Sequence, residues 1–234
     1  MATGDKHFVE LPELLLHLQY NDILCQVEGI NERLWDQIVV DIYINNNDRN
    51  NGNWGVLLDK STSKYILAPI FDNGASFSPK SSDKQLQGML ADKTRFEKSI
   101  MMGKTAYAID GQQLDSAAML KLDYPGLKTA IERNIELIKE NRDTIAQMIS
   151  DIPNTFDEKY VCSELRKEFY IESLNSRVEK LLEPAVKKNL VFSKDVGNIF
   201  DKRLDAIRAK EALEDKGIKE HQALTRKIME NDER

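Results

Sequence analysis

The spacing of hydrophobic residues along the chain predicts a mostly helical protein. A stripe of leucines indicates a helix over residues 10–26, with Pro12 near its start. Gly29 interrupts this pattern, and Asn31 could then cap a second helix. In the second helix, hydrophobic residues recur at steps of three and four along one face: Leu34, Trp35, Ile38, Val39 and Ile42.

The helical pattern stops at an asparagine-rich segment, residues 45–53, which reads NNNDRNNGN. Asparagine, aspartate and glycine are typical of turns, so we expect a loop there. Two short β-like runs follow at 54–59 and 65–70, and the polar turn between them predicts a hairpin. A second loop occupies residues 71–82.

The rest of the chain again favours helices. The pattern over 83–122 leaves the type of its short elements open. Pro125 opens a long helix that we expect to end before Pro153, and further helices are predicted over about 163–182 and 195–230. We therefore predict a mainly α fold with a small β-hairpin, organised as a single domain over 1–234. In it, the two loops lie within 45–82 and a helical bundle covers 113–234.

Composition narrows the class of protein. Hydrophobic residues make up 41% of the chain and charged residues 31%, which is typical of a soluble globular protein. The net charge of -6 argues against a nucleic-acid surface across the domain, so we expect no direct nucleic-acid partner. The two cysteines, Cys25 and Cys162, form no metal or disulfide motif. No run reaches the roughly 20 apolar residues that cross a bilayer, and we expect a cytoplasmic protein without a membrane partner.

The two loops that flank the hairpin carry the candidate chemistry. In the protein-kinase pattern, a catalytic aspartate is followed five positions later by a metal-binding asparagine, and a second aspartate opens the segment D-F-G. Here Asp48 is followed at that spacing by Asn53, and the hairpin leads to Asp72, Asn73 and Gly74. The order loop, hairpin, loop predicts that these polar groups meet at one end of a two-stranded ribbon.

Each residue type suits one part of phosphoryl transfer from ATP. Asp48 would orient the attacking hydroxyl and accept its proton, and Asn53 and Asp72 would supply oxygen ligands for Mg²⁺. Gly74 would allow a sharp turn after the metal ligand. Arg49, the other candidate catalytic residue, would either steady the loop or approach the transferred phosphate.

The string DRNNGNWG, with PIFDNG downstream, resembles the HipA-type serine/threonine kinases and their smaller CtkA-like relatives. Their pattern is D-R-H-x-x-N-x-G, and Asn50 stands here at the histidine position. We expect Asn50 to hydrogen-bond within the loop and to belong, with Asn53 and Asp72, to the cofactor-binding residues. The resemblance is specific over Leu34–Phe77. It implies an ATP- and Mg²⁺-dependent kinase that acts on a protein substrate, often the toxin of a toxin–antitoxin pair with an antitoxin partner.

The resemblance covers only the C-terminal lobe of a kinase. The glycine-rich loop and strand lysine of an N-lobe are not recognisable in residues 1–33. We therefore expect a separately encoded subunit, or parent sequence absent from this chain, to supply the N-lobe. The alternative is a catalytically silent kinase fold that binds a protein partner. A phosphoinositide-kinase-like enzyme is less favoured, because the chain is short and acidic and lacks a basic amphipathic segment.

A simpler reading of residues 45–53 is a solvated turn without chemistry. The joint occurrence of both loops, correctly ordered around a hairpin, favours the kinase-like site. Hydroxyls in this region could be phosphorylated, although loop solvation explains them more simply: Ser61, Thr62, Ser63, Ser76 and Ser78.

Overall fold

Helix α2 (Ile30–Ile44) leads directly into the first loop. Its hydrophobic stripe, which includes Leu34 and Ile38, is buried. The helix begins after Gly29, whose φ of +75° only glycine adopts readily, so the predicted cap at Asn31 is wrong. It ends at Asn45, which takes the left-handed conformation that often terminates helices.

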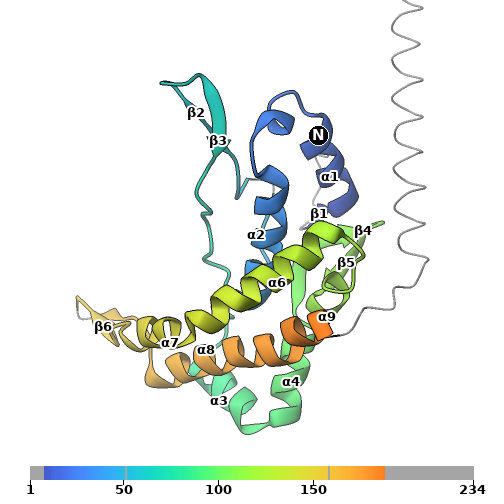
Figure 1. The fold of residues 1–234 in the computed structure, drawn as a ribbon. Helices are drawn as coiled ribbons and strands as arrows, with labels where there is room; N and C mark the ends of the chain where they lie inside the picture. Colours follow the sequence, from blue (N-terminus) through green and yellow to red (C-terminus); the bar gives the residue numbers. More distant parts are fainter. Residues whose placement is uncertain (1–7, 51, 158, 188–234) are drawn as a thin grey trace, which may run out of the picture. The chain divides into compact units, whose positions relative to one another are not determined.

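The computed structural model describes residues 8–50, 52–157 and 159–187 (Figure 1). These residues fall within one compact unit, 1–192, and a second unit, 193–234, lies outside the described residues. The helices besides α2 are α1 (Leu11–Tyr20), η1 (Leu24–Gln26), α3 (Asp83–Ala91), α4 (Lys93–Met101), α5 (Ser116–Met119), α6 (Pro125–Glu140), α7 (Arg142–Ser150), α8 (Glu164–Arg177), η2 (Val178–Leu182) and α9 (Glu183–Lys187). The strands are β1 (Val9–Glu10), β2 (Val56–Asp59), β3 (Lys64–Leu67), β4 (Lys104–Ile109), β5 (Gln112–Asp115), β6 (Thr155–Phe156) and β7 (Lys159–Tyr160).

The predicted hairpin is present as strands β2 and β3, which pair antiparallel from Val56 opposite Leu67 to Asp59 opposite Lys64. Asp59 organises the turn, because its carboxylate accepts hydrogen bonds from Ser61 and Thr62. In Figure 1 the hairpin stands away from the helices that follow it. The fold class predicted from the sequence, mainly α with a small hairpin, is confirmed.

The sequence pattern did not predict a second sheet. Strands β4 and β5 pair antiparallel, and β1 joins β4 in parallel, with Val9 opposite Tyr107. Strand β4 has four consecutive buried residues, from Thr105 to Ala108. A buried run of this length has no alternation of polar and apolar residues, and periodicity alone does not distinguish it from helix.

Two predicted helices are broken in the structure. The long helix from Pro125 divides at Asn141 into α6 and α7, because Asn141 leaves the helical conformation, with φ of −103° and ψ of 8°. Its side chain donates to the carbonyl of Leu137 at 2.8 Å. Helix α8 is capped by Ser163 and changes to a π-helical turn after Arg177. The helix predicted over 195–230, and with it the end of the predicted bundle, lies outside the described residues.

The core lies between α2, α6 and the three-stranded sheet. Trp35 of α2 is buried and lies against the ring of Tyr124 at 4.9 Å between centroids. Gly126, in the first turn of α6, packs directly beneath the Trp35 indole. This close approach packs α2 against α6. It therefore sets the orientation of α2 and the position of the first loop, which follows its C-terminus.

We expect Gly126→Ala to destabilise the protein by about 1–3 kcal/mol, because a Cβ at this position would overlap the Trp35 ring. Gly88→Ala is the matched control. Gly88 lies inside α3, and a Cβ there would be in ordinary contact, 3.9 Å from Arg95. That variant should gain about 0.5–1 kcal/mol from helix propensity. Urea unfolding followed by circular dichroism measures both, and equal effects from the two substitutions would contradict this account of the α2–α6 contact.

In the part of the chain that the structure describes, every helix is too short or too polar to cross a membrane.

Candidate functional site

The loop after α2 is held by main-chain hydrogen bonds that leave the Asp48 side chain exposed. The amide N–H of Asp48 donates to Oδ1 of Asn46 at 3.3 Å, and its carbonyl accepts from Nδ2 of Asn53 at 2.8 Å. Asn46 is itself buried and donates to Asp41 of α2 at 3.0 Å. The backbone of Asp48 is thus anchored while its carboxylate stays accessible, as a proton acceptor requires.

Asn50 makes the hydrogen bond within the loop that we expected of it. Its Oδ1 accepts from the amide of Gly52 at 2.8 Å, and its carbonyl accepts from the amide of Asn53 at 3.1 Å. A Cβ at Gly52 would lie 3.1 Å from Oδ1 of Asn50, so the small residue lets the turn close. In this arrangement the side chain of Asn50 stabilises the turn that carries Asn53.

Arg49 turns inward and is only 1% exposed. Its Nε and Nη2 donate to both carboxylate oxygens of Asp41, at 2.9 and 2.7 Å. Its Nη1 donates to the carbonyls of Asn53 at 3.2 Å and of Phe71, and Nη2 also donates to Oδ1 of Asn73. One guanidinium therefore joins α2, the first loop and the second loop. Of the two roles we considered for Arg49, this geometry supports the one that steadies the loop.

The ion pair of Asp41 and Arg49 is buried, and burial affects the pKa of both groups. Burial raises the pKa of Asp41 above its ordinary value, against the hydrogen bonds and charge of Arg49, which lower it. Burial also works to lower the pKa of Arg49, but the contact with Asp41 outweighs it and the pKa lies above its ordinary value. The neighbouring Tyr107 of β4 is buried, and burial together with Asp41 raises the pKa of its hydroxyl. Arg49 thus stays charged and depends on Asp41 as its counterion.

The second loop presents Asp72 through an unusual backbone conformation. Asp72 has a φ of +56°, a region that aspartate tolerates better than most residues. Its side chain is exposed, and its carbonyl lies 3.5 Å from Nη1 of Arg49. The chain turns at Gly74 as we expected, with the amide of Ser76 donating to the carbonyl of Asn73 at 3.1 Å, but Gly74 itself does not have a positive φ. The residues with positive φ in this loop are Asp72, Phe77 and Ser78.

The two loops meet at the end of the hairpin, as the loop order predicted. The carbonyls of Asn53 and Asp72 both lie within 3.5 Å of one nitrogen of Arg49. The Nδ2 of Asn53 is bonded to Asp48, so Oδ1 is the atom of this amide that could bind a cation. Among the described residues no group of three or more histidine, cysteine or acidic side chains could hold a metal ion. An amide oxygen and one carboxylate fit Mg²⁺, which takes its other ligands from phosphates and water.

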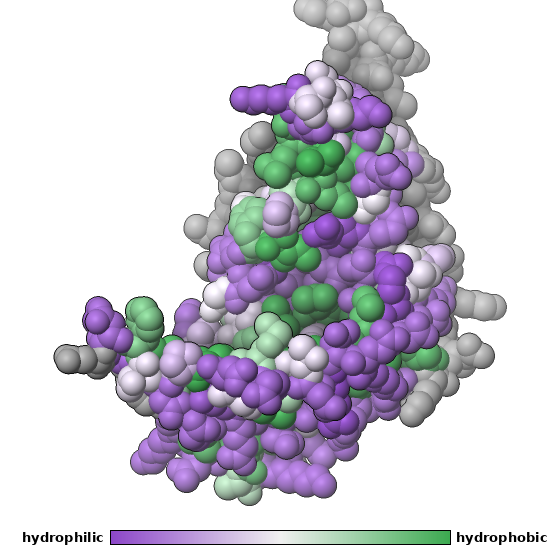
Figure 2. All heavy atoms as spheres, turned by 60° about the vertical axis from the view of Figure 1, so that its left-hand side comes forward, coloured by the Kyte–Doolittle hydropathy of each residue, from purple (hydrophilic) through white to green (hydrophobic). Residues whose placement is uncertain are grey.

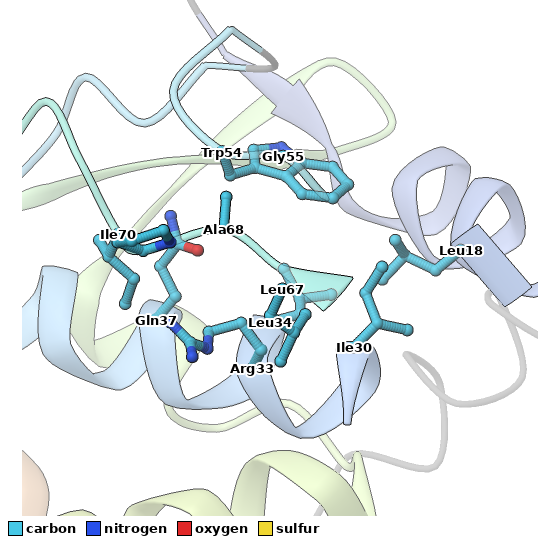
Figure 3. Close-up of a pocket in the computed structure, with 11 residues that line it drawn as sticks. Leu18, Ile30, Arg33, Leu34, Gln37, Trp54, Gly55, Leu67, Ala68 and Ile70 are labelled. Atoms are coloured by element: carbon cyan, nitrogen blue, oxygen red, sulfur yellow. The ribbon is translucent and has the colours of Figure 1, made fainter. Parts of the chain in front are cut away.

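A small cavity lies at the base of the hairpin, between it and α2 (Figure 3). Trp54 covers one side, and Leu34, Gln37 and Leu67 line it. Nε2 of Gln37 is buried without a hydrogen-bond partner among the described residues. The volume of about 20 Å³ has room for about one water molecule and is far below that of a nucleotide pocket. This cavity seats the hairpin, and a nucleotide would have to bind outside it.

Sequence reasoning missed the buried partners of these loops. Asp41 lies three residues after Ile38 on the apolar face of α2, and an acid on such a face was a signal of a buried ion pair. From the sequence, Asn73 was named only as the residue between Asp72 and Gly74, although its side chain accepts a hydrogen bond from Arg49. Arg177 of α8 is 2% exposed and donates to the carbonyl of Ile42, the last turn of α2, at 2.9 Å. No local pattern connects residues so far apart along the chain.

Comparison with known proteins finds similarity to a protein kinase. No family model matches the chain. Over 164 residues the chain is 28% identical to the serine/threonine-protein kinase CtkA of Helicobacter pylori, an alignment that covers 68% of this chain and 47% of that protein. The chain therefore spans about half the length of this curated relative. The crystal structure of a Helicobacter pylori proinflammatory kinase CtkA matches with a TM-score of 0.70 and 24% identity, over 80% of this chain and 66% of that chain.

The structural match supports the fold, and the sequence match supports the kinship. Both extend well beyond the motif segment over which the sequence resemblance was specific. The chain is therefore related to the HipA/CtkA type of protein kinases, and its fold is similar to the part of the CtkA structure that it matches.

Proposed function

We propose that this chain is the catalytic lobe of an ATP- and Mg²⁺-dependent serine/threonine protein kinase. The observation that carries the proposal is the buried guanidinium of Arg49, which holds the Asp48–Asn53 loop and the Asp72 loop together. A turn that only connects a helix to a strand has no need of such a link to a second loop. Phosphoryl transfer does need it, because the proton acceptor and the metal ligands must be positioned relative to each other.

In the proposed reaction, the oxygen of a serine or threonine hydroxyl forms a bond to the γ-phosphorus of ATP while the bond from that phosphorus to ADP breaks. The carboxylate of Asp48 orients the hydroxyl and accepts its proton. Oδ1 of Asn53 and the carboxylate of Asp72 would hold Mg²⁺, which when bound neutralises charge on the phosphates. Arg49 acts through the backbone, as a positioning residue, since it is buried and bonded to Asp41.

The partners in this proposal are a protein substrate and the missing N-lobe. The hairpin carries exposed hydrophobic residues on both strands, and one more follows it: Leu57, Leu58, Tyr65, Ile66 and Phe71. In Figure 2, which brings the side with the hairpin forward, hydrophobic residues gather near the top of the visible face. Exposed apolar groups of this kind mark interaction surfaces. An N-lobe, from a separate subunit or from parent sequence, would cover them and close the nucleotide site. A toxin role with an antitoxin partner belongs to the same proposal.

The test of the metal assignment is Mg²⁺-dependent nucleotide binding by calorimetry. We expect Asp72→Asn to weaken binding of Mg·ATP by at least about ten-fold, because the variant loses a charged ligand. Asparagine is chosen because it tolerates the φ of +56° that alanine would not. Removing Mg²⁺ should reduce the affinity of the wild type to that of the variant.

Asp59→Asn provides the matched control, since Asp59 is also an aspartate near the loops but lies at the end of β2, where its carboxylate accepts hydrogen bonds from Ser61 and Thr62. We expect its Mg·ATP affinity to equal that of the wild type. If Asp72→Asn, with an unchanged circular dichroism spectrum, binds Mg·ATP as tightly as Asp59→Asn, the metal assignment is wrong.

A further inference from the structure

The end of α8 buries a positive charge that no carboxylate among residues 8–50, 52–157 and 159–187 balances. Arg177 is 2% exposed, and burial lowers its pKa to about 10, so the guanidinium remains protonated at neutral pH. It forms no ion pair with any described residue. Its hydrogen bonds reach only neutral oxygens, the carbonyl of Ile42 at 2.9 Å and Oδ1 of Asn45 at 2.6 Å. A buried cation without a counterion is costly, and the C-terminus of α2 offers only a partial negative charge.

Two polar atoms on this face of α8 lack partners in the part of the chain that the structure describes. Nε of Arg177 and Oγ of Ser173 are both buried without a hydrogen bond among the described residues. The two residues are four apart on one helix, so their side chains lie on the same face. Ser173 is 7% exposed, so bulk water does not satisfy its hydroxyl. Two adjacent unsatisfied donors beside a buried charge are rare in native proteins and call for an explanation.

Both side chains line a cavity of about 50 Å³, which we call the Arg177 cavity. Asn45, Ser78 and Ser99 also line it, and none of its lining residues is acidic. A water molecule needs about 10–15 Å³ of cavity volume, so the cavity has room for several waters or for one small anion. Ser78 and Ser99 are half-buried, so part of the lining remains accessible to solvent.

We propose that the Arg177 cavity binds a small tetrahedral oxyanion, inorganic phosphate or sulfate. The guanidinium supplies charge and a free N–H donor, and Ser173 supplies a free hydroxyl, a donor set that suits oxyanions. An anion would also provide the counterion that the described residues do not supply. Water could occupy the same volume but would leave the charge unbalanced.

A bound anion would affect both loops, because Asn45 and Ser78 line the cavity. Asn45 ends α2 just before the Asp48 loop, and its Nδ2 lies 3.4 Å from Oγ of Ser78. Phe77 and Ser78 lie farther along the loop that carries Asp72, both with positive φ, of 60° and 58°. The amide of Phe77 donates to the carbonyl of Ile44 at 2.9 Å. A bound oxyanion would therefore stabilise this strained segment against the end of α2, at a place distinct from the Arg49 link.

The test is thermal unfolding of the full chain in increasing sodium phosphate or sulfate, with chloride used to keep the ionic strength constant. We expect the Tm to rise and to saturate. A general salting effect would raise Tm in all variants alike and without saturation. Ser173→Ala should weaken the apparent affinity by roughly ten-fold, the effect of one hydrogen bond to a charged group. Ser150→Ala is the control, because Ser150 is exposed on α7, bonds the carbonyl of Ala146 and does not line the cavity.

A further variant, Arg177→Lys, keeps the positive charge but removes the Nε donor. If this variant folds, the apparent affinity for the anion, taken from the saturable rise in Tm, should be at least about ten-fold weaker. Ser173→Ala decides the question even if the lysine variant does not fold. No saturable rise in the wild type overturns the proposal, as does a rise that Ser173→Ala leaves equal to that of Ser150→Ala. The measurement uses no nucleotide, so its outcome is independent of the proposed kinase activity.

Discussion

Replacing Arg49 with methionine should lower the free energy of unfolding by about 3–5 kcal/mol, the usual effect of removing one partner of a buried ion pair. The carboxylate of Asp41 would remain buried, with Asn46 as its remaining side-chain partner. The carbonyls of Asn53 and Phe71 would lose their shared donor. We expect the two loops to separate, so that Mg·ATP affinity falls as well.

Arg133→Met is the matched control for this prediction. Arg133 pairs with Asp36, also on α2, at the same distance of 2.7 Å as the pair of Arg49 and Asp41. The side chains of the control pair are 41% and 31% exposed, against 1% and 5% for the buried pair. An exposed pair contributes about 0–1 kcal/mol, so the control should lose no more than that.

Urea unfolding of both variants and of the double variant Asp41→Leu/Arg49→Met separates charge from packing. The double variant should be more stable than Arg49→Met alone, because it leaves no unpaired buried charge. Losses of equal size in Arg49→Met and Arg133→Met would contradict the structural role given to Arg49.

Asp48→Asn should lower the rate of phosphoryl transfer by about 10²–10⁴-fold without changing the affinity for Mg·ATP. An amide does not accept the proton of the attacking hydroxyl. Two side chains hydrogen-bond to the backbone of Asp48, Asn46 at the amide and Asn53 at the carbonyl. The substitution therefore leaves the loop contacts in place, and a loss of rate would reflect chemistry.

The measurement is intact-mass detection of phosphate on the chain and on an added protein substrate after incubation with Mg·ATP. Asp59→Asn again serves as control and should transfer phosphate at the wild-type rate. Transfer by Asp48→Asn at the rate of Asp59→Asn would rule out the proposed base. Absence of transfer by the wild type would favour the silent interaction module, and the same experiment with an added N-lobe would then separate an incomplete kinase from an inactive one.

Local patterns predicted the elements whose stability is local. The turn-forming residues of 45–53 indicated the loop, and the two β-like runs with a polar turn between them indicated the hairpin that the structure contains. The β4–β5 sheet was not predicted, because a strand buried on both faces has no period-two signal. The break at Asn141 was also missed, since the hydrophobic stripe continues on both sides of this residue and does not reveal its non-helical backbone angles.

The candidate site divides in the same way. The sequence by itself identified the candidate catalytic and metal-binding residues, because spacing and order were enough to place Asp48, Asn53 and Asp72 on two loops around one hairpin. Only the tertiary structure decided what holds those loops. Arg49 reaches Asn73 across 24 positions, and Arg177 reaches Ile42 across 135. A buried charge takes whichever oxygens the packed helices bring within hydrogen-bond distance, and that selection is made by three-dimensional packing, which no short stretch of sequence contains.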